Sequence, residues 1–137
     1  MANTVLDSSA VLALFFDEPA AEQVQQIIAE AADENREIFI SAVNWAEVLY
    51  KVQQLQGDAG VQAAKLFEHE TTLVVREVDR ELAELAAQLK VSYRLSVGDA
   101  FCAALAKQLK AVLVTGDAEF EPLETHFKKV VWLRGKE

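Results

Sequence analysis

The sequence has few of the residues on which several kinds of site depend. Cys102 is the only cysteine among 137 residues, which excludes an internal disulfide. With only two histidines beside it, a zinc site built from thiolates and imidazoles is not expected. No apolar run approaches the length needed to cross a membrane, and Met1-Ala2-Asn3 lacks the basic start of a signal peptide. We therefore expect a cytoplasmic chain with no membrane partner.

Positive charge is also scarce. The formal net charge is −9, and the first half of the chain carries it. Residues 1–70 hold twelve Asp and Glu against three Lys and Arg, whereas residues 71–137 hold ten of each. Bulk electrostatics would not attract nucleic acid to such a chain, because phosphate contacts need clustered cations. A phosphodiester substrate would require metal ions to offset the acids, and the acidic surface suits a basic protein partner.

Short apolar runs alternate with helical patterns along the whole chain. The apolar runs predict strands at residues 3–7, 37–40, 72–75, 111–115 and 130–132. Helical spacing of apolar residues predicts helices over 8–16, 20–34, 41–57, from Asp58 through Phe67, from Asp79 onward and over 96–110, with a short turn or helix after Asp117. Connections of this length exclude hairpins and favour a parallel sheet covered by helices on both faces. We expect one three-layer α/β domain over residues 1–137, with a sheet of about five short strands.

Four acidic residues stand out by their places in these elements. Asp7 ends the first strand and Asp117 follows the fourth, so both should emerge at the same edge of a parallel sheet, where ligands bind. Asp99 lies in the first turn of its helix and would point toward the start of that helix. Glu47 lies in the second turn of its helix among apolar neighbours, where a carboxylate is unexpected.

Each acid taken alone also has a structural explanation, because acidic side chains are common at helix starts and in turns. A helix cap would account for Asp7, and a capping box opened by Ser96 for Asp99. A turn would account for Asp117. Solvent exposure, with a lysine four residues later, would account for Glu47.

Taken together, the acids favour a metal site. Converging carboxylates would raise one another's pKa values unless a cation lay among them. Mg²⁺ and Mn²⁺ prefer oxygen ligands, and either could activate a water and stabilise charge on a phosphodiester. Ser9 and Thr115, each two residues from an acid, could orient the carboxylates with their hydroxyls.

Four segments resemble the PIN-domain nucleases in order and spacing: Val5-Leu6-Asp7-Ser8-Ser9, Asn44-x-x-Glu47-Val48, Leu95-Ser96-x-x-Asp99-Ala100 and Val114-Thr115-Gly116-Asp117. The resemblance covers essentially the whole chain. The size of the chain and its Asn-Trp-Ala-Glu-Val segment look most like the VapC toxins of bacterial and archaeal toxin–antitoxin pairs. The resemblance implies a PIN-like fold and an endoribonuclease dependent on Mg²⁺ or Mn²⁺. It also implies a homodimer and a small VapB-like antitoxin that blocks the site.

Carried over residue by residue, the resemblance identifies an acidic quartet and two hydroxyl positions. The quartet is Asp7, Glu47, Asp99 and Asp117, and the hydroxyls are those of Ser9 and Thr115. We expect the three aspartates to bind the metal and Glu47 to assist, directly or through water. Some members carry a further acid two residues after the last one, where Glu119 stands in this sequence.

The sequence departs from expectation in lacking a basic run for RNA. Lys51, one turn after Glu47, and Arg94, just before the helix of Asp99, are the candidates for phosphate contacts. Ordinary solvated charges would also explain both, since most surface cations have no specific partner. We expect the remaining residues with reactive or aromatic side chains to be core or surface residues without a role in the site: Cys102, His69, His126, Trp45 and Phe101.

Three other interpretations fit parts of the pattern. A phosphatase of the haloacid-dehalogenase type also has an aspartate after its first strand, but it needs a second acid where this chain has Ser9. A response-regulator receiver needs an acidic pair near the first strand and a phosphorylatable aspartate ending a central strand, and neither the second nor the third strand supplies such an aspartate. An inactive PIN scaffold that only binds protein or RNA is the third, and the intact quartet argues against it.

Overall fold

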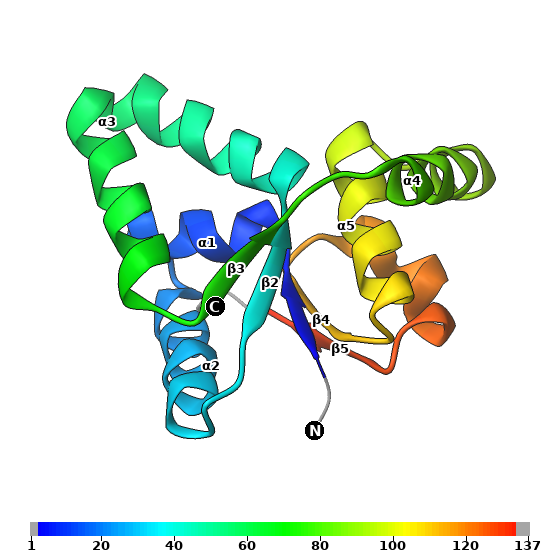
Figure 1. Cartoon of the computed structure of the whole chain (residues 1–137), viewed down its shortest axis with the longest axis horizontal. Helices are drawn as coiled ribbons and strands as arrows, with labels where there is room; N and C mark the ends of the chain where they lie inside the picture. The colour runs from blue at the N-terminus through cyan, green and yellow to red at the C-terminus, as the bar shows by residue number, and fades with distance from the viewer. Residues whose placement is uncertain (1–2, 134–137) are drawn as a thin grey trace.

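A five-stranded parallel sheet lies in the middle of the molecule in the computed structural model, which describes residues 3–133 (Figure 1). Its strands are β1 (Thr4–Leu6), β2 (Ile38–Ser41), β3 (Leu73–Arg76), β4 (Val112–Thr115) and β5 (Lys129–Trp132). They are ordered β3-β2-β1-β4-β5, and every neighbouring pair is parallel. Each strand lies within one residue of its predicted position at either end.

Helices cover both faces of this sheet. They are α1 (Ser8–Phe15), α2 (Ala21–Asp33), α3 (Ala42–Glu70), α4 (Arg80–Tyr93), α5 (Val97–Gln108) and the 3-10 helix η1 (Ala118–His126). Figure 1 shows α1, α2 and α3 on one side of the sheet and α4 and α5 on the other. Successive strand residues alternate between the two sides. Leu6 and Val114 therefore join the core beneath α1 to α3, while Val5 and Leu113 join the core beneath α4 and α5. The predicted three-layer fold is confirmed.

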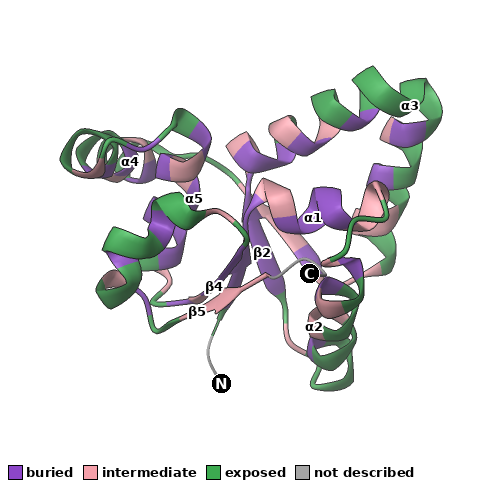
Figure 2. Cartoon of the chain, turned by 180° about the vertical axis from the view of Figure 1, so that it is seen from behind, coloured by how far each residue is buried: buried purple, intermediate pink, exposed green. Residues whose placement is uncertain are grey.

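Burial follows this layering. Figure 2 shows buried residues concentrated in the central strands of the sheet and on the sheet-facing sides of the helices. All three residues of β1 and all four of β2 are buried, as expected for strands covered on both faces. Among residues 3–133, no helix has both the length and the apolar composition that crossing a bilayer requires.

The long helix α3 bends at Gly57. The sequence predicts one helix ending near this glycine and a second one after it. In the structure the two run on as one element, and Gly57 alone has non-helical backbone angles within it, φ 68° and ψ −158°. A residue with a side chain rarely adopts this conformation. The bend, visible in Figure 1, lets the second half of α3 return toward β3 while the first half stays at the carboxyl edge of the sheet.

The residues expected to be core or surface residues are placed accordingly. Cys102 and Trp45 are buried, and His69 is exposed. Phe101 packs against the core beneath α4 and α5. His126 is half-buried, with its Nε2 atom 2.6 Å from the Tyr93 hydroxyl at the end of α4.

Candidate active site

The carboxyl ends of β1 and β4 bring acids from distant parts of the chain to one edge of the sheet. Asp7 directly follows β1, and Asp117 lies two residues after β4, which pairs with β1 in parallel. The first turn of α5 supplies Asp99, and the second turn of α3 supplies Glu47. These four acids line one cleft of about 420 Å³. The full lining is Asp7, Ser8, Ser9, Leu12, Phe16, Glu18, Glu47, Lys51, Ser96, Asp99, Asp117 and Glu119.

Asp7 forms the floor of this cleft and is only 3% exposed. Its Oδ1 atom accepts hydrogen bonds from the Ser9 hydroxyl at 2.6 Å and from the Ala10 backbone N–H at 3.0 Å. Its Oδ2 atom accepts one from the Thr115 hydroxyl. Burial raises the pKa of Asp7, and these three hydrogen bonds oppose the rise. Asp7 therefore caps α1, which was the structural alternative for this residue. Its carboxylate also lines the cleft with the other acids.

Thr115 connects the two strand-end aspartates. Its buried hydroxyl donates to Asp7 and also accepts from the Asp117 backbone N–H at 3.0 Å. The substitution Thr115→Val keeps the shape of the side chain but leaves one Asp7 oxygen without its buried donor. We expect a loss of about 1–3 kcal/mol in the free energy of unfolding, which is the usual cost of an unsatisfied buried polar group. Urea denaturation measures this loss.

Thr125→Val is the matched control, because Thr125 is exposed on η1. That variant should unfold within about 0.5 kcal/mol of the wild type. Equal stability of the Thr115→Val and Thr125→Val variants would show that the Thr115 hydroxyl does not hold Asp7.

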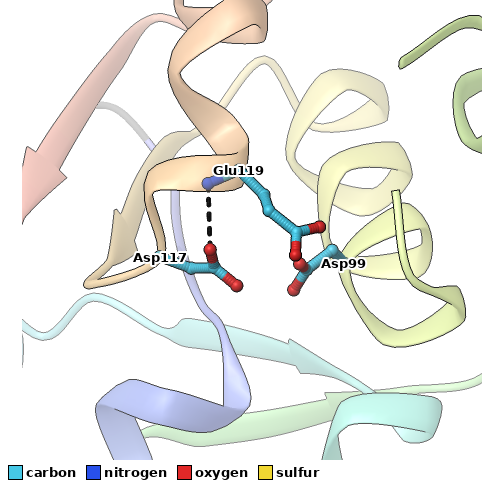
Figure 3. A group of neighbouring side chains, drawn as sticks. All are labelled: Asp99, Asp117 and Glu119. Atoms are coloured by element: carbon cyan, nitrogen blue, oxygen red, sulfur yellow. Dashed lines mark hydrogen bonds between the residues drawn. The ribbon is translucent and has the colours of Figure 1, made fainter. Parts of the chain in front are cut away.

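Three acids lie closest together. Asp99, Asp117 and Glu119 each offer a carboxylate oxygen, and these oxygens lie within 4.8 Å of one another. Figure 3 shows the carboxylates of Asp99 and Glu119 converging, with that of Asp117 directed toward the same space. The Glu119 backbone N–H donates to Asp117 Oδ1 at 2.9 Å, a local turn that brings Glu119 back toward the cleft.

Crowding of these acids changes the protonation of Asp99. Burial together with the neighbouring carboxylates of Asp117 and Glu119 raises the pKa of Asp99 from 3.8 to about 8. Asp99 therefore holds a proton at neutral pH when no cation is bound. The ion pairs found within residues 3–133 join Arg36 to Glu34 and Arg80 to Glu84, so they leave these acids uncompensated.

The structure brings together most of the residues that the sequence predicted for the site. Besides the quartet, Ser9, Lys51 and Glu119 line the cleft, and Thr115 lies directly behind Asp7. Arg94 is exposed at the end of α4, where it adopts φ 56° and ψ 40°, and it is not one of the cleft residues.

Three residues of the cleft had no signal in the sequence, namely Leu12 of α1, Phe16 and Glu18. Phe16 and Glu18 come from the connection between α1 and α2, which carries no recognisable motif. Glu119 did have one, namely its place two residues after an aspartate that follows a strand.

The donor set suits a hard divalent cation. Among the residues that the structure describes, it consists of carboxylate oxygens without a thiolate or an imidazole, and Mg²⁺ and Mn²⁺ prefer this chemistry. Burial and the neighbouring carboxylates both raise the pKa of Asp99, and a bound cation would offset these effects by stabilising the ionised form. The residues present therefore fit such a metal.

The sequence matches the family model described as the PIN domain over residues 4–124. No match is found among curated proteins. The fold is similar to that of the DNA-bound VapBC complex of Salmonella typhimurium, at 18% identity and a TM-score of 0.79, covering 98% of this chain and 100% of that chain.

Two further solved structures share the fold at similarly low identity. VapBC2 of Rickettsia felis, bound to a promoter DNA fragment, is 16% identical with a TM-score of 0.78, covering 96% of this chain and 98% of that chain. VapC20 of Mycobacterium tuberculosis, a toxin that cleaves the sarcin-ricin loop, is 18% identical with a TM-score of 0.73, covering 88% and 95%. The family match extends over both strand ends and all six acids of the cleft. The chain is a member of the PIN-domain family.

Proposed function

We propose that this chain is an endoribonuclease that requires Mg²⁺ or Mn²⁺ and acts as the toxin of a toxin–antitoxin pair. One observation carries the proposal: the carboxylates of Asp99, Asp117 and Glu119 converge in a cleft that Asp7 and Glu47 also line. Membership in the PIN family removes the phosphatase and receiver interpretations. Among the fold relatives, VapC20 cleaves an RNA loop, which favours RNA as the substrate here.

The roles of the residues follow from their surroundings. Asp7, Asp99 and Asp117 are the proposed metal ligands, with Glu119 as a further candidate. Such a metal, when bound, lowers the pKa of a water and stabilises charge on a phosphodiester.

The remaining cleft residues support the ligands and the substrate. The hydroxyls of Ser9 and Thr115 hold Asp7 in a single orientation by donating to opposite oxygens of its carboxylate. Glu47 assists at the metal, directly or through water. Among residues 3–133, Lys51 is the one Lys or Arg that lines the cleft, and it is the proposed contact for the RNA phosphate.

The partner follows from charge and from the fold relatives. VapBC structures are complexes of a toxin with an antitoxin, and several relatives of this chain are of that kind. The net charge of −9 favours a basic surface on the partner. We propose a small VapB-like antitoxin that covers the cleft, and a homodimer of this chain. The cytosol, where both RNA and such an antitoxin are present, is the proposed location.

The test is cleavage of total cellular RNA by the purified chain, freed of bound protein, with Mg²⁺, with Mn²⁺ and with EDTA. We expect discrete fragments with metal, none with EDTA and none from an Asp7→Asn variant. If folded, partner-free protein yields no fragments with either metal, the nuclease proposal fails and a binding module becomes the better account. If fragments do form with metal, mapping their ends identifies the RNA that is cut.

A further inference from the structure

Asn44 is a buried amide whose Nδ2 atom bonds Glu47 and the backbone next to Asp99. It lies in the first turn of α3 and is 1% exposed. Its Nδ2 atom donates to Glu47 Oε1 at 3.0 Å and to the backbone carbonyl of Gly98 at 3.0 Å. Its Oδ1 atom accepts from the hydroxyl of Ser41, the residue that caps α3. Both amide protons and the amide oxygen therefore have partners.

Gly98 leaves the space that the Glu47 carboxyl group occupies. A Cβ atom at residue 98 would lie 2.4 Å from Glu47 Oε2, 2.6 Å from Oε1 and 2.7 Å from Cδ. These are the three nearest heavy atoms, so the Glu47 carboxyl group occupies the space where a Cβ atom of residue 98 would lie. Gly98 immediately precedes Asp99 in the first turn of α5, where the helix dipole favours a carboxylate.

These two contacts fix Glu47 from both sides. The amide of Asn44 donates a hydrogen bond to one oxygen of the Glu47 carboxylate, and the missing Cβ atom at Gly98 leaves room for that carboxyl group. The same amide bonds the carbonyl next to Asp99, so α3 and α5 are joined at the point where each supplies an acid to the cleft. A side chain that only joined the two helices would not need to contact the Glu47 carboxylate.

We propose that Asn44 is a positioning residue. Together with the absence of a side chain at Gly98, it fixes the position of the Glu47 carboxylate relative to Asp99. The proposal rests on the proposed function, because positioning is useful only if Glu47 takes part in metal-dependent cleavage. Asn44 touches neither metal nor RNA in this account. It acts entirely through Glu47, and this separates it from a residue that merely stabilises the fold.

The test uses two independent disruptions, Asn44→Ala and Gly98→Ala, each made in the wild type and in a Glu47→Ala background. In the wild type, each should lower kcat for RNA cleavage about ten- to hundredfold, the usual effect of removing a supporting group of a metal site, with KM for RNA within about twofold. Mn²⁺ affinity, measured by calorimetry without RNA, should fall about tenfold in both variants. In the Glu47→Ala background neither substitution should lower kcat or Mn²⁺ affinity further.

Thermal melting gives a readout that needs neither metal nor RNA. Gly98→Ala should lower the melting temperature of the wild type by about 3 °C or more relative to its effect in the Glu47→Ala background, because its Cβ atom displaces the Glu47 carboxyl group from its hydrogen bond with Asn44. In the Glu47→Ala background the same substitution should cause no such fall. Asp79→Ala, which removes the cap of α4 far from the cleft, is the control for stability loss alone and should leave kcat unchanged.

Two results would overturn the proposal. One is full additivity of Asn44→Ala with Glu47→Ala in kcat and Mn²⁺ affinity. The other is an equal fall in melting temperature for Gly98→Ala in both backgrounds. If the wild type neither binds Mn²⁺ nor cleaves RNA, the proposed function fails, and the melting comparison still decides whether Glu47 is held as described.

Discussion

Replacing Asp99 with asparagine should lower the rate of metal-dependent RNA cleavage by at least about a hundredfold. Removing a residue that only supports a metal ligand lowers activity by up to about a hundredfold, so loss of a ligand itself should cost at least as much. The carboxylate of Asp99 lies in the tightest group of acids, so its loss removes a proposed ligand and not a peripheral charge. The fold should survive, because α5 is capped by the hydroxyl of Ser96 through the backbone N–H of residue 99. Initial cleavage rates at saturating Mn²⁺ measure the effect.

The same variant should be more stable than the wild type when no metal is present. The pKa of Asp99 is about 8 in the folded chain against an ordinary 3.8, so between about pH 4 and pH 8 the folded state holds a proton that the unfolded state has released. The stability of the metal-free wild type therefore falls as pH rises through this window, and Asp99→Asn escapes that loss. Melting temperatures should be similar near pH 4 and should separate progressively up to about pH 8, with the variant higher.

Glu124→Gln provides a matched control for the charge change. It also removes one negative charge, but from an exposed residue of η1 that does not line the cleft. It should leave both the cleavage rate and the pH dependence of melting unchanged. Normal cleavage by Asp99→Asn would show that Asp99 is not a metal ligand.

The framework of this site could be predicted from the sequence because parallel strands end at one edge. Once β1 and β4 were identified from their apolar runs, Asp7 and Asp117 had to emerge near each other. Local chemistry also located Asp99, since Ser96 opens its helix. These inferences use only chain order and short-range patterns, and the structure follows both.

The remaining features depend on contacts between elements that no local pattern encodes. The amide of Asn44 reaches Gly98, 54 residues away, and nothing in either segment signals the pair. Glu18 lines the cleft although it lies in the α1–α2 connection, far in sequence from Glu47, Asp99 and Asp117. Arg94 illustrates the opposite case: it is near Asp99 in sequence, yet the left-handed turn that ends α4 leaves it exposed and outside the cleft lining.

Metal affinity should depend steeply on pH in a range where ordinary carboxylates show no dependence. A metal can bind Asp99 only after the proton has left, and that proton is held with a pKa of about 8. We therefore expect Mn²⁺ affinity to fall about fiftyfold between pH 8 and pH 6, with the slope approaching about tenfold per pH unit well below pH 8. Calorimetry in buffers of different ionisation enthalpy should show release of at least about one proton per metal bound at pH 7.

This pH dependence distinguishes a cluster of carboxylates with a raised pKa from a cluster in which every carboxylate has an ordinary pKa. Carboxylates with ordinary pKa values near 4 are fully ionised from pH 6 to pH 8, so their affinity for a cation would be constant over that range. The burial of Asp99 and its proximity to Asp117 and Glu119 make the difference. In the Asp99→Asn variant residue 99 no longer titrates, so the residual affinity for Mn²⁺ should vary much less with pH. An affinity in the wild type that stays constant from pH 6 to pH 8 would mean that the three carboxylates do not share one cation.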